Sequence, residues 1–259
     1  MEENKENVNE EQVSQSSNAE TSTNVNNENN SNNSKEDLKK ETTETVNQVK
    51  DTLKNTDLKE ASKEAKGFFS SFFKDPLKEL KKVASSSSNK YIKIAIVILV
   101  IWLVAILVSN VFSVASRYLF STYGSFSYFF RNLFSNILDI ITELVAPIIT
   151  VLVLSGLVYA FKKKKNKSFL TIASSILIAK IPVVIAVIVD LLILINSSFS
   201  KIATAFSGFC SILSTVLLYF AIKNLSDEDK NDSYFWKFAL IMGIFYIVKF
   251  VFSYLGIYL

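Results

Sequence analysis

The sequence predicts an all-α protein: a polytopic membrane bundle of five transmembrane helices, preceded by a disordered tail and an amphipathic helical segment. The chain has 259 residues, of which 49% are hydrophobic, yet residues 1–67 contain no Phe, Tyr or Trp. The remainder holds every aromatic residue and several long uncharged runs. This division excludes a single, evenly mixed globular domain and indicates a polar segment followed by a membrane domain.

The first predicted domain, residues 1–34, is a disordered tail rich in Asn and Glu. Apart from Met1, its apolar residues are a few valines and one alanine. Such a segment cannot bury enough apolar surface to offset the entropy lost on ordering. It also has neither the basic start nor the apolar core of a signal peptide.

The second predicted domain, residues 35–89, is a charged amphipathic helical region. Val46, Val49 and Leu53 recur at helical spacing and predict a thin apolar stripe. The stripe has too few large apolar side chains for a helix that is stable alone, and a coiled coil is not expected. Further along, Asp75 suits an N-cap and Pro76 the first helical position, so a short helix should begin there.

Phenylalanine and lysine are concentrated around this predicted helix start, close to the first apolar run. Rings could enter the acyl chains while ammonium groups meet anionic headgroups, so we expect contact with the membrane interface. The alternative is that the helix packs its phenylalanines into the protein's own core. The residues expected to contact the interface are Phe68, Phe69, Phe72, Phe73, Lys74, Lys78, Lys81 and Lys82.

The third predicted domain, residues 90–259, contains the five spans. Residues 94–116 and 202–222 carry no charge and are long enough to cross a hydrocarbon core of about 30 Å. The other three runs are interrupted by single charged residues. The expected spans are residues 91–113, 137–161, 169–195, 202–222 and 236–259.

The distribution of lysine predicts the orientation of these spans. Lysines gather before the first span, between the second and third, and after the fourth, whereas the opposite loops carry few basic residues. The positive-inside rule then gives a cytoplasmic N-terminus and an outside C-terminus in a plasma (cell) membrane. The excess of basic residues therefore indicates the orientation of the chain and contact with anionic headgroups. No nucleic-acid partner is expected.

The composition argues against an enzyme. The chain has no His and one Cys, which excludes the usual zinc ligand sets, Ser-His and Cys-His nucleophile pairs and an intrachain disulfide. Six glycines and no Gly-rich motif leave no phosphate loop. We therefore expect no catalytic residue, metal or cofactor.

Ionisable residues inside spans are costly and are candidate functional residues. At a rise of about 1.5 Å per residue, Lys180 falls near the bilayer midplane, and Glu143 and Lys249 are within reach if their spans touch. These residues could form a proton or cation relay through Glu143 and Lys180. Alternatively, they could form a structural ion pair, with the lysines snorkelling toward the interface, and we favour this second interpretation. The candidates are Glu143, Lys180, Asp190 and Lys249.

Two features inside the spans concern packing. Pro182 follows Lys180 by two residues, so a freed backbone carbonyl could meet a polar group there. In the fourth span, Thr204, Ser207, Gly208, Ser211 and Thr215 form a small-residue face that we expect to be buried against a neighbouring helix, with a homo-oligomer contact as an alternative. Cys210 lies off this face and should be an inert, packed thiol.

Three stretches resemble the Yip1-domain family: Asp75-Pro76-Leu77-Lys78-Glu79-Leu80, the run from Ser168-Phe169-Leu170 to Ile181-Pro182, and Tyr219-Phe220-Ala221-Ile222-Lys223. The resemblance covers residues 70–259 and implies a polar cytoplasmic tail, five spans and an outward C-terminus. Eukaryotic members are linked to vesicle traffic and small GTPases, a role that we do not carry across. The family supplies no catalytic residues to place on this chain.

Two functions from different classes follow. The first is a non-enzymatic, Yip1-like membrane-organising or partner-binding component, whose tail and Phe/Lys segment contact a protein partner. The second is a small permease or transporter subunit with an intramembrane polar site around Lys180, Pro182 and Glu143.

Overall fold

The computed structural model describes residues 43–44, 46–47, 50–51, 58–86, 88–118, 130–131, 134–161, 167–195, 197–226 and 233–254. The predicted disordered tail, residues 1–34, lies outside this set, as do residues 119–129, 162–166 and 227–232. Contacts divide the chain into Met1–Glu44 and Thr45–Leu259. Everything below concerns the second unit.

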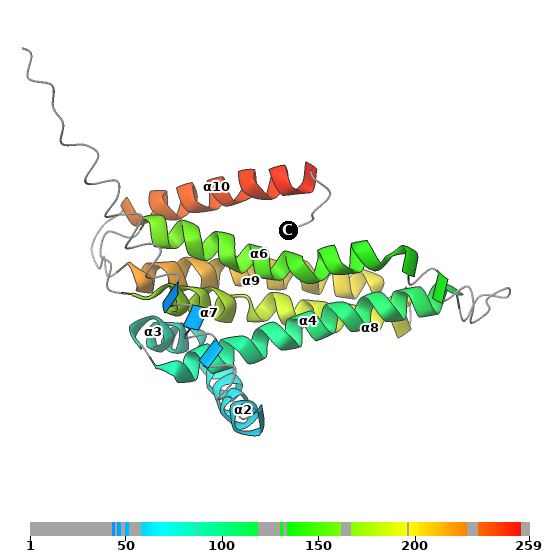
Figure 1. Cartoon of the computed structure of the whole chain (residues 1–259), viewed down its shortest axis with the longest axis horizontal. Helices are drawn as coiled ribbons and strands as arrows, with labels where there is room; N and C mark the ends of the chain where they lie inside the picture. The colour runs from blue at the N-terminus through cyan, green and yellow to red at the C-terminus, as the bar shows by residue number, and fades with distance from the viewer. Residues whose placement is uncertain are drawn as a thin grey trace, which may run out of the picture. The chain divides into compact units, whose positions relative to one another are not determined.

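Every element in the described residues is a helix, which confirms the all-α fold class (Figure 1). In chain order these are α2 (Leu58–Lys74), α3 (Pro76–Ser85), α4 (Asn89–Tyr118), α6 (Ile137–Phe161), α7 (Phe169–Ala179), α8 (Ile181–Ile195), the short 3₁₀ helix η1 (Ser197–Phe199), α9 (Ser200–Leu225) and α10 (Ser233–Tyr254).

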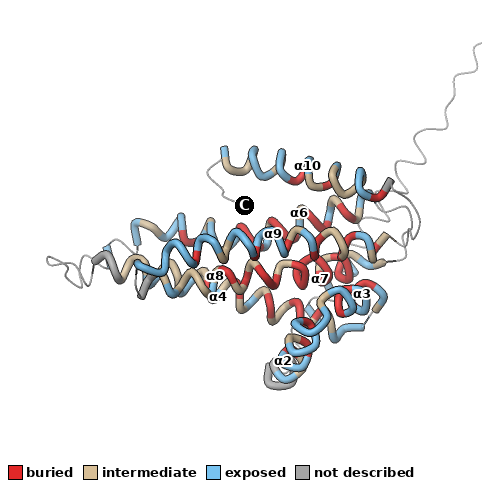
Figure 2. Tube along the Cα trace, turned by 180° about the vertical axis from the view of Figure 1, so that it is seen from behind, coloured by how far each residue is buried: buried red, intermediate tan, exposed pale blue. Residues whose placement is uncertain are grey.

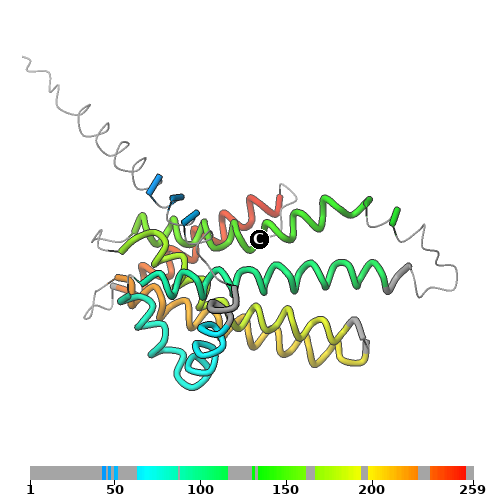
Figure 3. The backbone as a smooth tube through the Cα atoms, turned by 60° about the horizontal axis from the view of Figure 1, so that its bottom comes forward, coloured from blue at the N-terminus to red at the C-terminus, as the bar shows by residue number. Residues whose placement is uncertain are grey.

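Four of these helices are long and apolar enough to cross a membrane: α4, α6, α9 and α10. The pair α7 and α8 makes a fifth when counted as one span, since it passes the same test together but bends by 43°. Past the bend α8 continues alongside α4 and α9 instead of turning back (Figure 3). The residues of the predicted third span therefore form two helices that together are long and apolar enough to cross a membrane.

The core lies where α7 meets α3, α4 and α9. Figure 2 shows the buried residues gathered around α7 and the adjoining parts of its neighbours. Ile172, Ile176 and Ile178 of α7 are each 0% exposed, and they share one cluster with Leu80 of α3 and Leu218 of α9. The most buried part of the protein core therefore lies around α7, the first helix of the pair α7 and α8.

The spans also present large apolar side chains outward. Only 28–33% of the most apolar window of α4, α6 and α9 is buried, and 11% of that of α10. Exposed residues such as Val104, Ile141, Ile212 and Phe250 would make apolar patches far beyond what a water-soluble surface carries. A lipid environment accounts for them, so the chain is compatible with a multi-pass membrane protein.

The helices α2 and α3 form a hairpin whose joint the sequence predicted. Pro76 is the first residue of α3, and the Asp75 carboxylate accepts a hydrogen bond from the Lys78 amide at 3.0 Å. This side chain replaces a missing helical partner at the N-terminus of α3. The hairpin packs against α4, α7 and α9 and is part of the same unit as the spans.

For two of the phenylalanines the expected membrane contact is wrong. Phe68 is 5% and Phe72 is 2% exposed, both within the protein's core, which was the alternative reading. The physical reason is helical period: residues four apart share a face, and that face of α2 also carries the buried Ala65 and packs against α4. Phe69 is half-buried and Phe73 is exposed, so membrane contact by these two stays a prediction.

Candidate functional site

The outer face of the α2–α3 hairpin is both basic and apolar. Leu77 is 42% exposed, and the lysines around it are also exposed. Phe73 is 63% exposed but lies at the flank of α2, beside apolar grooves that it shares with α4, α8 and α9. Because the inner face of the hairpin is fixed to the spans, this outer face has a defined position beside the start of the membrane domain. Its lysines are Lys66, Lys74, Lys78 and Lys81.

A polar pocket of about 330 Å³ lies between α2, α3 and the first turn of α4. Glu79 of α3 is 6% exposed and forms an ion pair with Lys82 at 2.6 Å. Lys63 and Glu64 of α2 and Lys90 of α4 line the same space. Five charged side chains from three helices therefore surround one cavity. The sequence alone did not indicate this arrangement, because the contributions of α2, α3 and α4 are separated along the chain.

The hydrogen bond from Lys82 to Glu79 raises the pKa of the Lys82 ammonium above its ordinary value of 10.5. A raised pKa on a basic group favours the folded state at every pH below the unfolded-state value. This contribution is complete at neutral pH and is lost only as the pH rises through the folded-state pKa above 10.5. Lys82 is thus charged beside Glu79 at neutral pH.

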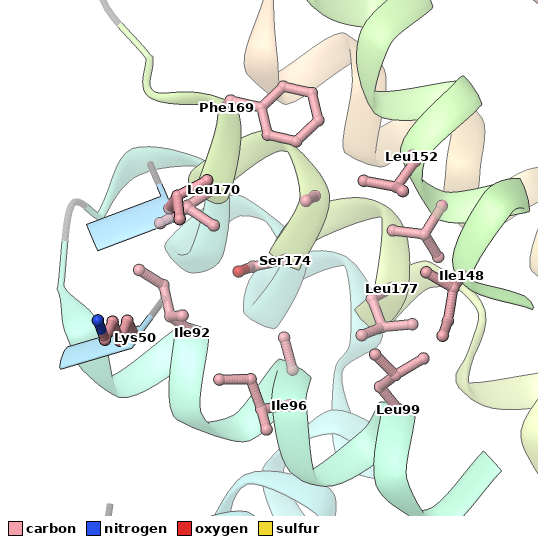
Figure 4. Close-up of a pocket in the computed structure, with 14 residues that line it drawn as sticks. Lys50, Ile92, Ile96, Leu99, Ile148, Leu152, Phe169, Leu170, Ser174 and Leu177 are labelled. Atoms are coloured by element: carbon pink, nitrogen blue, oxygen red, sulfur yellow. The ribbon is translucent and has the colours of Figure 1, made fainter. Parts of the chain in front are cut away.

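An apolar cavity of about 620 Å³ opens between α4, α6 and α7 (Figure 4). Ile96 and Leu99 of α4, Ile148 and Leu152 of α6, and Leu177 of α7 form its walls. Its polar lining residues are Ser174 and Lys50, and Lys50 lies near Ile92 at one end (Figure 4). The cavity has room for a hydrocarbon group, but its lining residues do not form a catalytic site.

Glu143 of α6 pairs with an amide and not with a lysine. The Asn110 side chain of α4 donates to the Glu143 carboxylate at 2.6 Å, and it also donates to the Ile106 carbonyl. Helices α6 and α10 are in contact, but no ion pair joins Glu143 to Lys249 or Lys180, all three of which are described. Neither the relay pair nor the expected structural ion pair is formed.

Lys180 lies at the break between α7 and α8. Its amide bonds back to the Ile176 and Leu177 carbonyls, and the buried Ser214 hydroxyl of α9 donates to the Ala179 carbonyl at 3.1 Å. A polar side chain therefore meets the backbone at the break, although the carbonyl that Pro182 leaves without its helical donor is that of the preceding residue, Ile178. Ser214 is 1% exposed, so this hydrogen bond is packed within the protein, whereas Pro182 borders an apolar groove of about 420 Å³.

Asp190 of α8 lines an open polar groove with the small residues of α9. Ser109 of α4 and Thr204, Ser207, Gly208 and Ser211 of α9 share this groove of about 610 Å³. The expectation that this small-residue face is buried against a neighbouring helix is wrong within the chain, because Thr204, Gly208 and Ser211 are exposed. The buried face of α9 is instead the adjacent one, with Ala203, Ser214 and Leu218.

Lys249 is exposed on α10, near enough to Lys180 for the two charges to interact. Cys210 is a buried free thiol, as expected, and borders an apolar groove that also contains Pro182. Among the described residues, no group of three or more His, Cys, Asp or Glu side chains could hold a metal ion. Asn110 was missed because a single amide in an apolar run gives little signal without knowledge of its neighbour.

Comparison of the chain with protein-family models, with curated proteins and with solved structures gives no match.

Proposed function

We propose that the chain is a non-enzymatic multi-pass membrane protein of Yip1-like architecture that acts as a membrane-organising or partner-binding component. The observation that carries the proposal is the α2–α3 hairpin. Its inner face is anchored among the spans by Phe68, Phe72 and Leu80, while its outer face presents Leu77 and several lysines. Phe73 is exposed at the flank of the hairpin, beside the spans. A fixed platform with an exposed aromatic and positive charge suits an acidic protein partner or a membrane surface.

The dispersal of the intramembrane charges supports a non-enzymatic role. Glu143, Lys180 and Asp190 have separate surroundings, so they do not converge on a point where a substrate could sit. In the proposed orientation, the hairpin faces the cytoplasm and the C-terminus lies outside in a plasma membrane. The lysine distribution along the sequence is the support for this orientation.

The proposal is tested by crosslinking and pull-down of the tagged protein from membranes. A deletion of residues 1–89 is unsuitable for this test, because it would remove Leu80, Val83 and Ala84 from the core. The test instead compares the full chain, a chain lacking residues 1–44, and a variant with Lys74, Lys78 and Lys81 changed to Gln. Changing the exposed Lys201, Lys223 and Lys249 to Gln gives a control with the same change in charge.

We expect the hairpin variant to lose its partners and the control variant to keep them. The chain lacking residues 1–44 shows whether the tail adds to the contact. Recovery of an unchanged set of partners with both the hairpin variant and the shortened chain would argue against the proposal.

The second candidate is a small permease or transporter subunit. The broken third span favours it, because discontinuous helices near the midplane form substrate sites in many transporters. Flux measured in proteoliposomes should then fall in Lys180→Ala and Glu143→Gln variants that remain folded. Unchanged flux in both would remove this candidate.

A further inference from the structure

The polar pocket between α2, α3 and α4 contains charges that the protein itself leaves uncompensated. Glu79 and Lys82 neutralise one another at 2.6 Å. The ammonium groups of Lys63 and Lys90 also border the pocket, and neither forms an ion pair with a described residue. Since the Glu64 carboxylate lines the same pocket, these two lysines leave it with a net positive charge of one.

Glu64 adds a second, opposite requirement. Its Oε2 atom is buried from solvent and has no hydrogen-bond partner in the structure. A buried carboxylate oxygen without a hydrogen-bond partner is unfavourable, so a donor at this position would be favoured. The complementary ligand thus carries negative charge for the two lysines and a hydroxyl or similar donor for Glu64.

The position of the pocket identifies where such a ligand comes from. Lys90 is in the first turn of α4, whose candidate span is Asn89–Ala115. The uncharged part of this span begins only four residues later, at Ile94. The pocket is therefore at the level where phospholipid headgroups meet the end of a transmembrane helix.

We propose that this pocket binds the headgroup of an anionic phospholipid that also carries hydroxyl groups, of the phosphatidylglycerol type. Lys63 and Lys90 contact the phosphate, and a headgroup hydroxyl donates to Glu64. A choline headgroup is less complementary, because its quaternary ammonium has no N–H or O–H group to donate to Glu64. The proposal rests on the chain spanning the membrane and is independent of the partner-binding role.

The test uses the full chain in a neutral detergent, with bound lipids counted by native mass spectrometry. The probes have the same acyl chains and different headgroups: phosphatidylglycerol, phosphatidylcholine and phosphatidylmethanol, which is anionic but has no hydroxyl donor. We expect about tenfold preference for phosphatidylglycerol over phosphatidylcholine, the size of one charge-assisted interaction. A smaller preference over phosphatidylmethanol should also be present.

Variants separate the two requirements of the pocket. The double variant Lys63→Ser/Lys90→Ser should lose the preference for anionic lipid, whereas Lys66→Ser/Lys78→Ser, which removes two exposed lysines of the same hairpin outside the pocket, should keep it. Glu64→Ala should abolish only the preference for phosphatidylglycerol over phosphatidylmethanol. Gel filtration and circular dichroism check folding, and Lys63→Ser alone replaces the double variant if that one does not fold.

Three results would overturn the proposal. One is an unchanged lipid preference in the folded pocket variants, and another is an equal loss in the control variant, which would indicate unspecific surface charge. The third is displacement of the lipid by glycerol 1-phosphate at equal concentration, which would make the site one for a soluble phosphate. A negative result here leaves the pull-down result standing, so the two proposals fail separately.

Discussion

At the scale of single residues, the four neighbouring phenylalanines of α2 divide into two kinds. Phe68 and Phe72 lie one helical turn apart on the buried face, and their ring centroids are 5.8 Å apart. Phe69 is half-buried and Phe73 is exposed, and both border an apolar groove formed with α4 and α8. The same residue type therefore stabilises the fold at one position and remains available for contact at the next.

This difference predicts unequal effects of truncation. Phe72→Ala removes a ring that is 2% exposed and should lower the free energy of unfolding by about 3–5 kcal/mol. Phe73→Ala removes a ring that is 63% exposed and should cost less than about 1 kcal/mol. Thermal unfolding in detergent measures both, and equal destabilisation would contradict the assignment of the two faces.

At the scale of elements, the break between α7 and α8 depends on α9. The Ser214 hydroxyl supplies a donor to the Ala179 carbonyl across the helix interface, and α8 packs mainly against α9. The Pro182 ring explains why the helix is interrupted here, since it removes a backbone donor and disfavours a straight continuation. The bend is thus stabilised by an element that follows it in the sequence.

Ser214→Ala should destabilise the protein by about 1–3 kcal/mol, because it leaves the Ala179 carbonyl without this donor in a buried position. Ser211→Ala is the matched control, since Ser211 is three residues away on the same helix and exposed. Denaturation in detergent should show little change for the control. A similar effect of both variants would mean that the hydrogen bond does not hold the break.

At the scale of the whole molecule, five spans and the lysine distribution together predict the topology. The lysine-rich segment 162–166 and the C-terminal residues 255–259 lie outside the described structure, so this prediction depends on the sequence and the span count. An odd number of spans places the two ends of the membrane domain on opposite sides of the bilayer.

Reporter fusions test this directly. A reporter fused after Lys165 should be active on the cytoplasmic side, and one fused after Leu259 on the outside. A cytoplasmic reporter at Leu259 would contradict five spans, and would require α7 and α8 to enter and leave the membrane on one side.

Several features were predictable because they depend on local chemistry. Helix existence and approximate ends follow from uncharged runs, and the start of α3 follows from Asp75 and Pro76, which act on their immediate neighbours. The partner of Glu143 was not predictable. Lys249 was a possible partner because its depth along its helix is similar to that of Glu143. The lateral arrangement of the helices instead places Asn110 of another span beside the Glu143 carboxylate.

The sequence by itself determined that the chain is helical, that it has about five apolar spans, and where its lysines cluster, because hydropathy and charge act through composition over a whole segment. Only the tertiary structure decided which face of each helix is buried. In α2 it placed Phe68 and Phe72 inward, and in α9 it buried Ser214 and left the small-residue face around Ser211 open. The physical reason is that a span with apolar residues all around has no preferred face until neighbouring helices and a polar contact, such as Ser214 with Ala179, select one.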